Sequence, residues 1–269
     1  MLPPALPASS FLIIFIEDTH AITGMRFSFE AKLPVVLHGT LVVVNIIFLN
    51  TWHSEMPPEL HAYVKGIVAT VDVFCFTEAF ESDLYIYDEV LADFSKIAVE
   101  KRHETLRFGN VMYVRKGMKI LESDTFFTDD TSVGLAHYAT LEKNGVQTVV
   151  CSMHGIPYPG DKLDTSERLR QTKVLLEAFA GRKRVVIGGD FNLLPDTESI
   201  RQFAASGYRD LISDYGIQTT RNYLTFEKYP DSPQYFADYA FTSPDIAVRD
   251  FIVPAVIVSD HQPLELSID

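Results

Sequence analysis

Several apolar runs in this chain end at a polar side chain of a kind that enzymes use. The first run, residues 41–50, is rich in Val, Leu and Ile and ends on an amide. Continuous β-branched runs of this length are typical of strands buried on both faces. Strand ends that face one way line one crevice of a layered α/β fold, so polar residues there are candidates for a ligand site. The residues in these positions are Asn50, Glu78, His154, Asp190 with Asn192, Asp238, and Asp260 with His261.

The pattern along the chain alternates between strands and helices. Expected strands cover residues 41–50, 71–76, 110–114, 134–141, 148–153, 185–189, 235–242, 247–253 and 255–258. A helix is expected to start at Pro57 and Pro58, and a second to follow Asp164 and Glu167, which are spaced as in a capping box. Since no repeat, linker or low-complexity tract follows position 41, we expect one domain over residues 41–269.

Residues 1–40 differ from the rest of the chain. Pro3, Pro4 and Pro7 open the chain, and short apolar pieces without a sustained period follow. We assign these residues to an N-terminal extension, with an added edge strand, a disordered leader or an early start codon before Met25 as open alternatives. The apolar stretch 11–16 is too short for a transmembrane helix.

The charge balance narrows the range of partners. Lys and Arg number 23 against 36 Asp and Glu, which gives a net charge of −13 and removes the usual electrostatic signature of a tight nucleic-acid binder. A carboxylate cluster that holds Mg²⁺ would offset part of this charge, so a nucleic-acid substrate is disfavoured without being excluded. Cys75 and Cys151 each lie in an apolar run, which suits a reducing compartment, and we expect a cytoplasmic monomer.

Two motifs carry most of the chemical signal. Gly188-Gly189-Asp190-Phe191-Asn192 combines glycines that permit close backbone approach with two oxygen ligands two residues apart. Ser259-Asp260-His261 places a hard oxygen ligand beside an imidazole. Each has an ordinary alternative, an Asx turn for the first and a capped strand end for the second, so neither is decisive alone.

The candidate residues together match one chemistry. Phosphoester hydrolysis needs a hard cation for the phosphoryl oxygens, an acid or amide pair to orient and deprotonate water, and donors for the charge on the equatorial oxygens. Carboxylates, amides and two histidines supply all three. The sequence therefore favours a divalent-metal-dependent phosphoester hydrolase.

From about position 41 to the end, the chain resembles the endonuclease/exonuclease/phosphatase superfamily, whose fold is that of deoxyribonuclease I. The resemblance rests on motifs in the family's order: Leu49-Asn50-Thr51, Thr77-Glu78, Gly109-Asn110, Met153-His154-Gly155, Gly189-Asp190-Phe191-Asn192, Ala237-Asp238-Tyr239 and Ser259-Asp260-His261. Thr77 departs from the Gln that often precedes the metal-binding Glu. The resemblance implies a four-layered α/β sandwich of two packed, mostly antiparallel sheets flanked by helices, whereas periodicity alone suggests an open doubly wound sheet.

The resemblance also implies roles for the site residues. Glu78 and Asp260 would hold Mg²⁺ or Mn²⁺, with Asn50 near the metal and phosphate. Asp190, positioned by Asn192, would activate the attacking water. The scissile phosphate would be bound by His261, oriented by Asp238, and by His154, which would donate to a second phosphoryl oxygen.

Further candidates follow His154. Arg168, with Gln171, matches a recurring family pattern, so we expect it to bind substrate phosphate, with Asn110 as a second lining residue. Lys162 and Arg170 read more simply as ordinary surface charges at a helix start.

The natural substrate stays open. Nucleic acid, a nucleotide or sugar phosphate, and a phospholipid head group are all compatible, although no basic stripe interleaved with aromatics and no long hydrophobic hairpin is present. The alternative from another class is a catalytically silent scaffold that binds proteins. A complete set of chemically competent residues favours the enzyme.

Overall fold

A computed structural model describes residues 42–129, 132–231 and 234–269, and the expected extension over 1–40 lies outside this range. Its strands are β1 Val44–Asn50, β2 Val73–Thr77, β3 Phe94–His103, β4 Leu106–Arg115, β5 Lys119–Phe126, β6 Leu135–Lys143, β7 Val146–His154, β8 Val185–Asp190, β9 Arg209–Asp210, β10 Asp238–Thr242, β11 Val248–Ile252 and β12 Leu264–Ile268. Its helices are η1 Trp52–Ser54, α1 Pro57–Ile67, η2 Glu81–Asp83, α2 Tyr85–Asp88, α3 Ser166–Ala178, α4 Glu198–Ala205, α5 Leu211–Asp214 and α6 Tyr223–Lys228.

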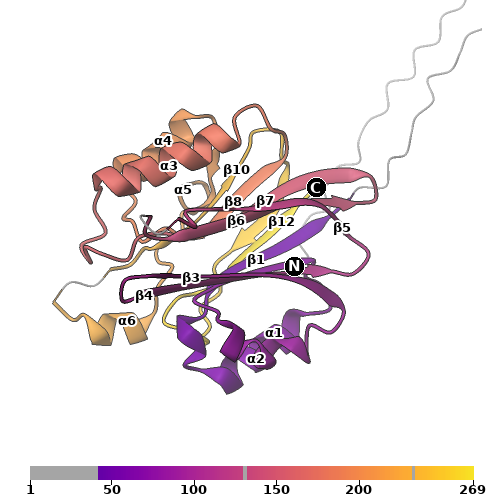
Figure 1. The fold of residues 1–269 in the computed structure, drawn as a ribbon, viewed down its shortest axis with the longest axis horizontal. Helices are drawn as coiled ribbons and strands as arrows, with labels where there is room; N and C mark the ends of the chain where they lie inside the picture. Colours follow the sequence, from indigo (N-terminus) through magenta and orange to yellow (C-terminus); the bar gives the residue numbers. More distant parts are fainter. Residues whose placement is uncertain (1–41, 130–131, 232–233) are drawn as a thin grey trace, which may run out of the picture. The chain divides into compact units, whose positions relative to one another are not determined.

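The strands form two packed six-stranded sheets. One has the order β11-β12-β1-β2-β4-β3 and the other β5-β6-β7-β8-β10-β9. The pairs β1–β2 and β7–β8 are parallel, and the other pairs among the described strands are antiparallel. Helices α1 and α2 cover the first sheet, and α3, α4 and α5 cover the second (Figure 1). The expected four-layered sandwich is confirmed, and the open doubly wound sheet suggested by periodicity is not what the chain forms.

Burial explains why the sheets pack face to face. Phe48 of β1 points into the space between them, where a Cβ at Gly188 of β8 would lie 2.6 Å from its ring. Glycine at that position therefore lets an aromatic ring from one sheet contact the backbone of the other. On the outer face of the first sheet, α1 buries Leu60 and Val64, which lie four residues apart on one face of the helix.

Two local predictions are wrong. Asp164 does not cap the helix that follows it, because Thr165 is the N-cap of α3 and Asp164 instead accepts hydrogen bonds from the backbone of Glu198 and Ser199 at the start of α4. Residues 255–258 form no strand within the described chain, and the last strand is β12, which pairs antiparallel with β1. None of the helices in the described ranges has the length and apolar character needed to cross a membrane.

His137 of β6 is a buried titratable group away from the strand ends. Within the described residues, neither of its ring nitrogens has a hydrogen-bond partner, and burial lowers its pKa to about 4. The folded protein therefore takes up a proton at this ring less readily than the unfolded chain, whose histidine titrates near pH 6.5. The buried neutral ring therefore costs no stability above pH 6.5, and the free energy of unfolding decreases as the pH falls from 6.5 toward 4.

We expect the free energy of unfolding to fall by about 2 kcal/mol from this group alone between pH 7 and pH 5. His137→Leu should remove that part of the pH dependence, measured by urea unfolding at both pH values. His61→Leu, on partly exposed α1, is the matched control. An unchanged pH dependence in His137→Leu would contradict the assignment.

Candidate active site

Strand register brings the predicted residues of the second sheet into one row. His154 at the end of β7 pairs with Asp190 at the end of β8, and Asp190 pairs with Asp238 at the start of β10. Because β10 runs antiparallel to β8, its first residue lies beside the last residue of β8. The three side chains therefore occupy one edge of this sheet.

The first sheet contributes its own strand ends to the same place. Asn50 closes β1 beside Thr77, which closes the parallel strand β2, and Glu78 follows directly. The Asn50 side-chain amide donates to Glu78 Oε1 at 3.0 Å and to Asp190 Oδ2 at 2.9 Å. One amide thus joins the carboxylates of the two sheets.

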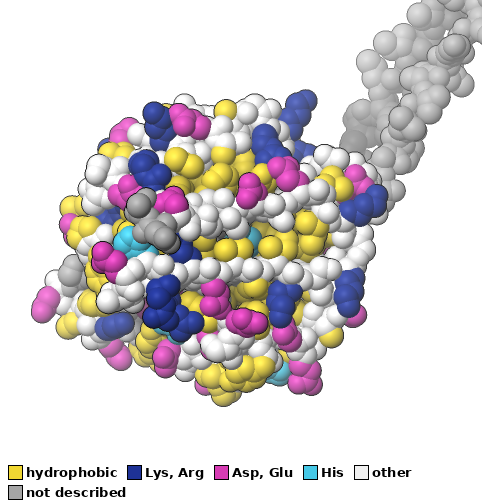
Figure 2. Space-filling view, in the orientation of Figure 1, with side chains coloured by type: hydrophobic (Ala, Val, Ile, Leu, Met, Phe, Trp, Pro, Cys, Tyr) yellow, Lys and Arg dark blue, Asp and Glu magenta, His cyan; other side chains and the backbone are white. Residues whose placement is uncertain are grey.

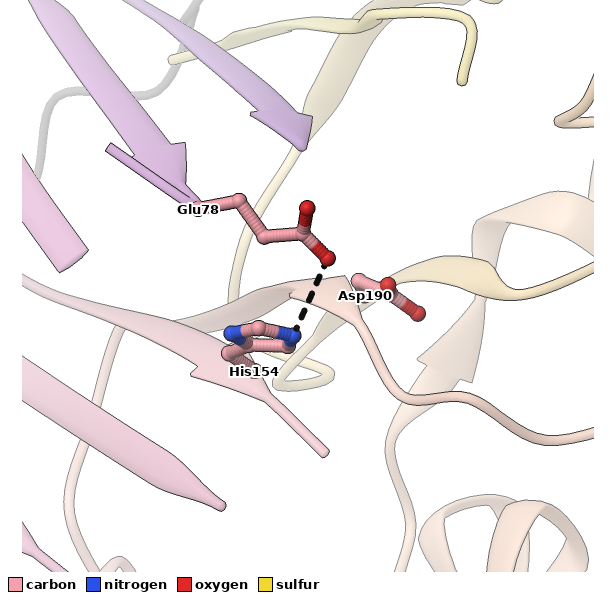
Figure 3. A group of neighbouring side chains, drawn as sticks. All are labelled: Glu78, His154 and Asp190. Carbon is pink, nitrogen blue, oxygen red and sulfur yellow. Dashed lines mark ion pairs between the residues drawn. The ribbon is translucent and has the colours of Figure 1, made fainter. Parts of the chain in front are cut away.

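Glu78 lies among three chemically active neighbours. Its backbone has a φ of 54°, and its carboxylate is 3.1 Å from His53 Nε2 and 3.6 Å from His154 Nε2. The side chains of Glu78, His154 and Asp190 point toward one another from three different strand ends (Figure 3), and each offers a ligand atom within 4.8 Å of the others. This group could hold a metal ion, and carboxylate oxygens suit Mg²⁺ or Mn²⁺.

Asp190 is held rigidly. Gly189 before it has a φ of +124°, and a Cβ there would lie 2.3 Å from the Met153 carbonyl oxygen, so the backbone at this point admits only glycine. The backbone N–H of Asn192 donates to Asp190 Oδ1 at 2.8 Å. Burial opposes ionisation of Asp190, but the positive groups around it, His261 foremost, lower its pKa to about 2. The carboxylate is therefore ionised throughout the neutral range.

His261 and Asp238 form a buried pair. His261 Nδ1 lies 2.9 Å from both carboxylate oxygens of Asp238, which fixes the ring and directs Nε2 toward Asp190 Oδ2 at 3.7 Å. Burial and Arg221 lower the pKa of His261, but the three surrounding aspartates outweigh them and raise it. Burial raises the pKa of Asp238 despite the neighbouring imidazole. The pKa of His154 is shifted the other way from that of His261, because burial lowers it by more than Glu78 and Asp190 raise it.

Arg221 is a site residue that the sequence did not reveal. It is only 6% exposed, and its guanidinium contacts the His261 ring and donates to Asp260 Oδ2 at 3.0 Å. The other oxygen, Asp260 Oδ1, is buried and has no hydrogen-bond partner among the described residues. Asp260, expected beside Glu78, is thus paired with an arginine, and its Oδ1 lies 3.8 Å from His261 Nε2.

Lys162 also differs from the prediction of an ordinary surface charge. It is 6% exposed, and its ammonium donates to Asn192 Oδ1. Burial lowers the pKa of Lys162, partly offset by Asp190. The lysine therefore belongs to the site and anchors the amide that follows the Asp190 turn.

Two expected substrate contacts have other partners. The Arg168 guanidinium donates to the backbone carbonyls of Leu163, Ile156 and Pro159, and Asn110 donates to the Leu135 carbonyl at 3.3 Å. Within the described residues, neither lines the cleft at the strand ends. This geometry assigns Arg168 to holding the loop before α3 in shape, because Nη1 and Nη2 both donate to carbonyls of that loop.

Arg168→Met keeps the alkyl stem and removes the donors of three carbonyls, so we expect the free energy of unfolding to fall by about 3 kcal/mol. Chemical denaturation measures this change. Arg170→Met, at a more exposed arginine paired with Glu167, is the control. Unchanged stability combined with weaker substrate binding would return Arg168 to a direct role.

The site opens into a cleft of about 800 Å³. Its lining combines the site residues with aromatic and basic side chains, namely Trp52, His53, Glu78, Thr105, Leu106, Arg107, Phe108, His154, Pro157, Tyr158, Gly160, Asp161, Lys162, Asp190, Asn192, Arg221, Lys228, Tyr229, Gln234, Asp260 and His261. A volume of this order suits a small organic ligand.

Comparisons with known proteins agree on the fold. An endonuclease/exonuclease/phosphatase family protein from Bacteroides thetaiotaomicron is 18% identical, with a TM-score of 0.67 over 84% of this chain and 97% of that chain. The mannosyl-6-phosphatase of the same organism is 17% identical, with a TM-score of 0.65 over 84% and 99%. D. rerio TDP2 in complex with a single-strand DNA product is 16% identical, with a TM-score of 0.63 over 84% and 99%.

A search of curated proteins finds no match. The sequence profile of the endonuclease/exonuclease/phosphatase family, however, matches residues 47–261, which span every strand-end residue of the site. This match covers most of the chain. The chain therefore belongs to the endonuclease/exonuclease/phosphatase family.

Proposed function

We propose that this protein is a divalent-metal-dependent phosphoester hydrolase. The observation that carries the proposal is the Asn50 amide, which bonds Glu78 at 3.0 Å and Asp190 at 2.9 Å. This amide joins Glu78, the expected metal ligand, to Asp190, the expected base, so the metal and the attacking water would lie close together. The fold relatives with known names act on a sugar phosphate or hold a DNA product, which supports phosphoester chemistry without selecting a substrate.

The side chains present fit a hard divalent cation. Glu78 and Asp260 would hold it, with Asn50 nearby, and the buried Asp260 Oδ1, which has no hydrogen bond among the described residues, is an oxygen that a cation would satisfy. Among the described residues, Asp260 is not in the same close group as Glu78, and it pairs with Arg221. A bound Mg²⁺ or Mn²⁺ supplies Lewis-acid polarisation of a phosphoryl oxygen.

The protein's own groups would carry the proton and the charge. Asp190, ionised because its pKa is about 2, accepts a proton from water as the water oxygen bonds to phosphorus and the bond to the leaving oxygen breaks. The leaving oxygen takes a proton from solvent. His261, held by Asp238, faces the phosphate as a donor, and His154 lies on the other side of Asp190.

The distribution of charged side chains on the surface bears on the size of the substrate. Figure 2 shows acidic and basic side chains interspersed on the face drawn, without a continuous basic stripe. With a net charge of −13, this arrangement favours a small soluble phosphoester over a long polyanion.

The test is release of product from p-nitrophenyl phosphate, bis-p-nitrophenyl phosphate, plasmid DNA and sphingomyelin, each with Mg²⁺, with Mn²⁺ and with EDTA. We expect turnover of at least one compound that requires metal. Metal binding without turnover of any of the four would contradict the proposal and favour the protein-binding scaffold.

A further inference from the structure

Two buried cations line the cleft beside the proposed catalytic residues. Arg221 and Lys162 are each 6% exposed and both belong to the cleft wall. Lys162 forms no ion pair among the described residues and donates to the neutral amide of Asn192. A buried cation normally needs an opposite charge, so this lysine faces the cleft with its charge incompletely compensated.

Arg221 has a counter-ion that the proposed metal would also use. Its Nη2 donates to Asp260 Oδ2 at 3.0 Å, its Nε donates to Thr225 at 3.0 Å, and its Nη1 contacts His261. If Asp260 shares its charge with a divalent cation, the guanidinium keeps a positive charge that Asp260 no longer balances. A planar guanidinium matches the oxygens of a phosphate group.

A hydrogen bond joins two parts of the cleft wall. The Gln234 side-chain amide donates to the carbonyl of Gly160, which lies in the loop before α3. Both residues line the cleft, so this bond ties the loop to the wall beside it.

We infer that the cleft takes the terminal phosphomonoester of a small soluble molecule, and that Arg221, with Lys162, binds the charge that distinguishes a monoester from a diester. A phosphomonoester carries close to two negative charges at neutral pH, because its second pKa is about 6, whereas a diester carries one. The two buried cations match the additional charge. This inference rests on the proposed hydrolase and names its substrate class.

The test compares p-nitrophenyl phosphate with bis-p-nitrophenyl phosphate, which share a leaving group, in wild type and Arg221→Gln. We expect wild type to prefer the monoester and the substitution to lower kcat/KM for it by roughly 30-fold or more. The loss for the diester should be at least about 5-fold smaller, because a diester carries one negative charge fewer for the guanidinium to bind. Arg209→Gln, at a partly exposed arginine paired with Asp214, is the matched control.

A second variant guards against loss of folding, since Arg221 pairs with a buried aspartate. Lys162→Gln removes a charge without breaking an ion pair among the described residues and should shift the preference in the same direction. Equal losses on both substrates in these variants, or a wild-type preference for the diester, would overturn the inference.

Measuring ligand affinity in the absence of turnover separates this inference from the proposed function. Isothermal titration of the Mg²⁺-loaded protein with inorganic phosphate and with dimethyl phosphate needs no turnover. We expect Arg221→Gln to weaken phosphate binding by roughly 30-fold, and to weaken dimethyl phosphate binding by a factor at least about 5-fold smaller. If no substrate is turned over but this pattern holds, only the proposed hydrolase fails. Unchanged phosphate binding overturns the inference even in an active enzyme.

Discussion

Asp190→Asn should lower kcat for a hydrolysed phosphoester by roughly 10³- to 10⁴-fold, because it removes the carboxylate that we propose as the acceptor of the proton of the attacking water. Both carboxylate oxygens are in use, Oδ1 by the Asn192 backbone and Oδ2 by Asn50. An amide can accept at only one of its two positions, so the other would face a donor. We therefore expect a moderate loss of stability beside the loss of activity.

Steady-state kinetics with saturating Mg²⁺ measure the effect, and thermal unfolding shows whether the variant is folded. Asp196→Asn, at an exposed acid six positions along the chain, should retain wild-type kcat. If folded Asp190→Asn protein kept a tenth or more of the wild-type kcat, Asp190 would not be the proton acceptor.

Glu78→Gln should weaken Mn²⁺ binding by at least about 100-fold, since loss of a partner that only orients a ligand already costs 10- to 100-fold. The substitution keeps the shape of the side chain and removes its charge. Activity should fall with metal occupancy and recover in part at high Mn²⁺ concentration, which distinguishes loss of metal from loss of the base.

Calorimetric titration with Mn²⁺ gives the affinity directly. Glu81→Gln, three residues along and exposed, is the control for the removal of one negative charge. Equal Mn²⁺ affinity in wild type and Glu78→Gln would mean that the cation binds elsewhere. The next candidates as ligands would be Asp260 and a second group of neighbouring side chains, Asp190, Asp238 and His261.

The site residues at strand ends were predictable from the sequence because each directly follows or closes an apolar run. An apolar run fixes a buried strand. Parallel pairing of β1 with β2 then brings Asn50 and Glu78 to one edge of the first sheet, and that of β7 with β8 brings His154 and Asp190 to one edge of the second. Asp238 reaches the same edge from the opposite direction because β10 is antiparallel. The four-layered arrangement, by contrast, came from the motif resemblance, since local periodicity does not say which strands share a sheet.

The buried cations were not predictable from local pattern. Arg221 lies in a loop without an apolar run before it, and its position depends on a bridge to His261, forty residues away in sequence. Lys162 lies in the loop that Arg168 holds together through three backbone carbonyls. In both cases tertiary contacts determine the exposure. In this loop the sequence offered only Arg168, which matches a family pattern, and that pattern does not say where the side chain points.

Strands β3 and β5 were missed for a related reason. Both carry exposed and charged residues along much of their length, as in Lys96–Lys101 of β3, where exposed and partly buried side chains are mixed. Such edge strands lack the apolar run that marks a buried strand. Their pairing with β4 and β6 is a property of the assembled sheet.

The most direct test of the central claim is a crystal structure of the protein soaked with Mn²⁺ and inorganic phosphate, with the cation located by its anomalous scattering. The account predicts one strong peak within coordination distance of the Glu78 and Asp260 carboxylates, with phosphate between it and His261. Full Mn²⁺ occupancy at another place, with Glu78 and Asp260 free of metal, would contradict it.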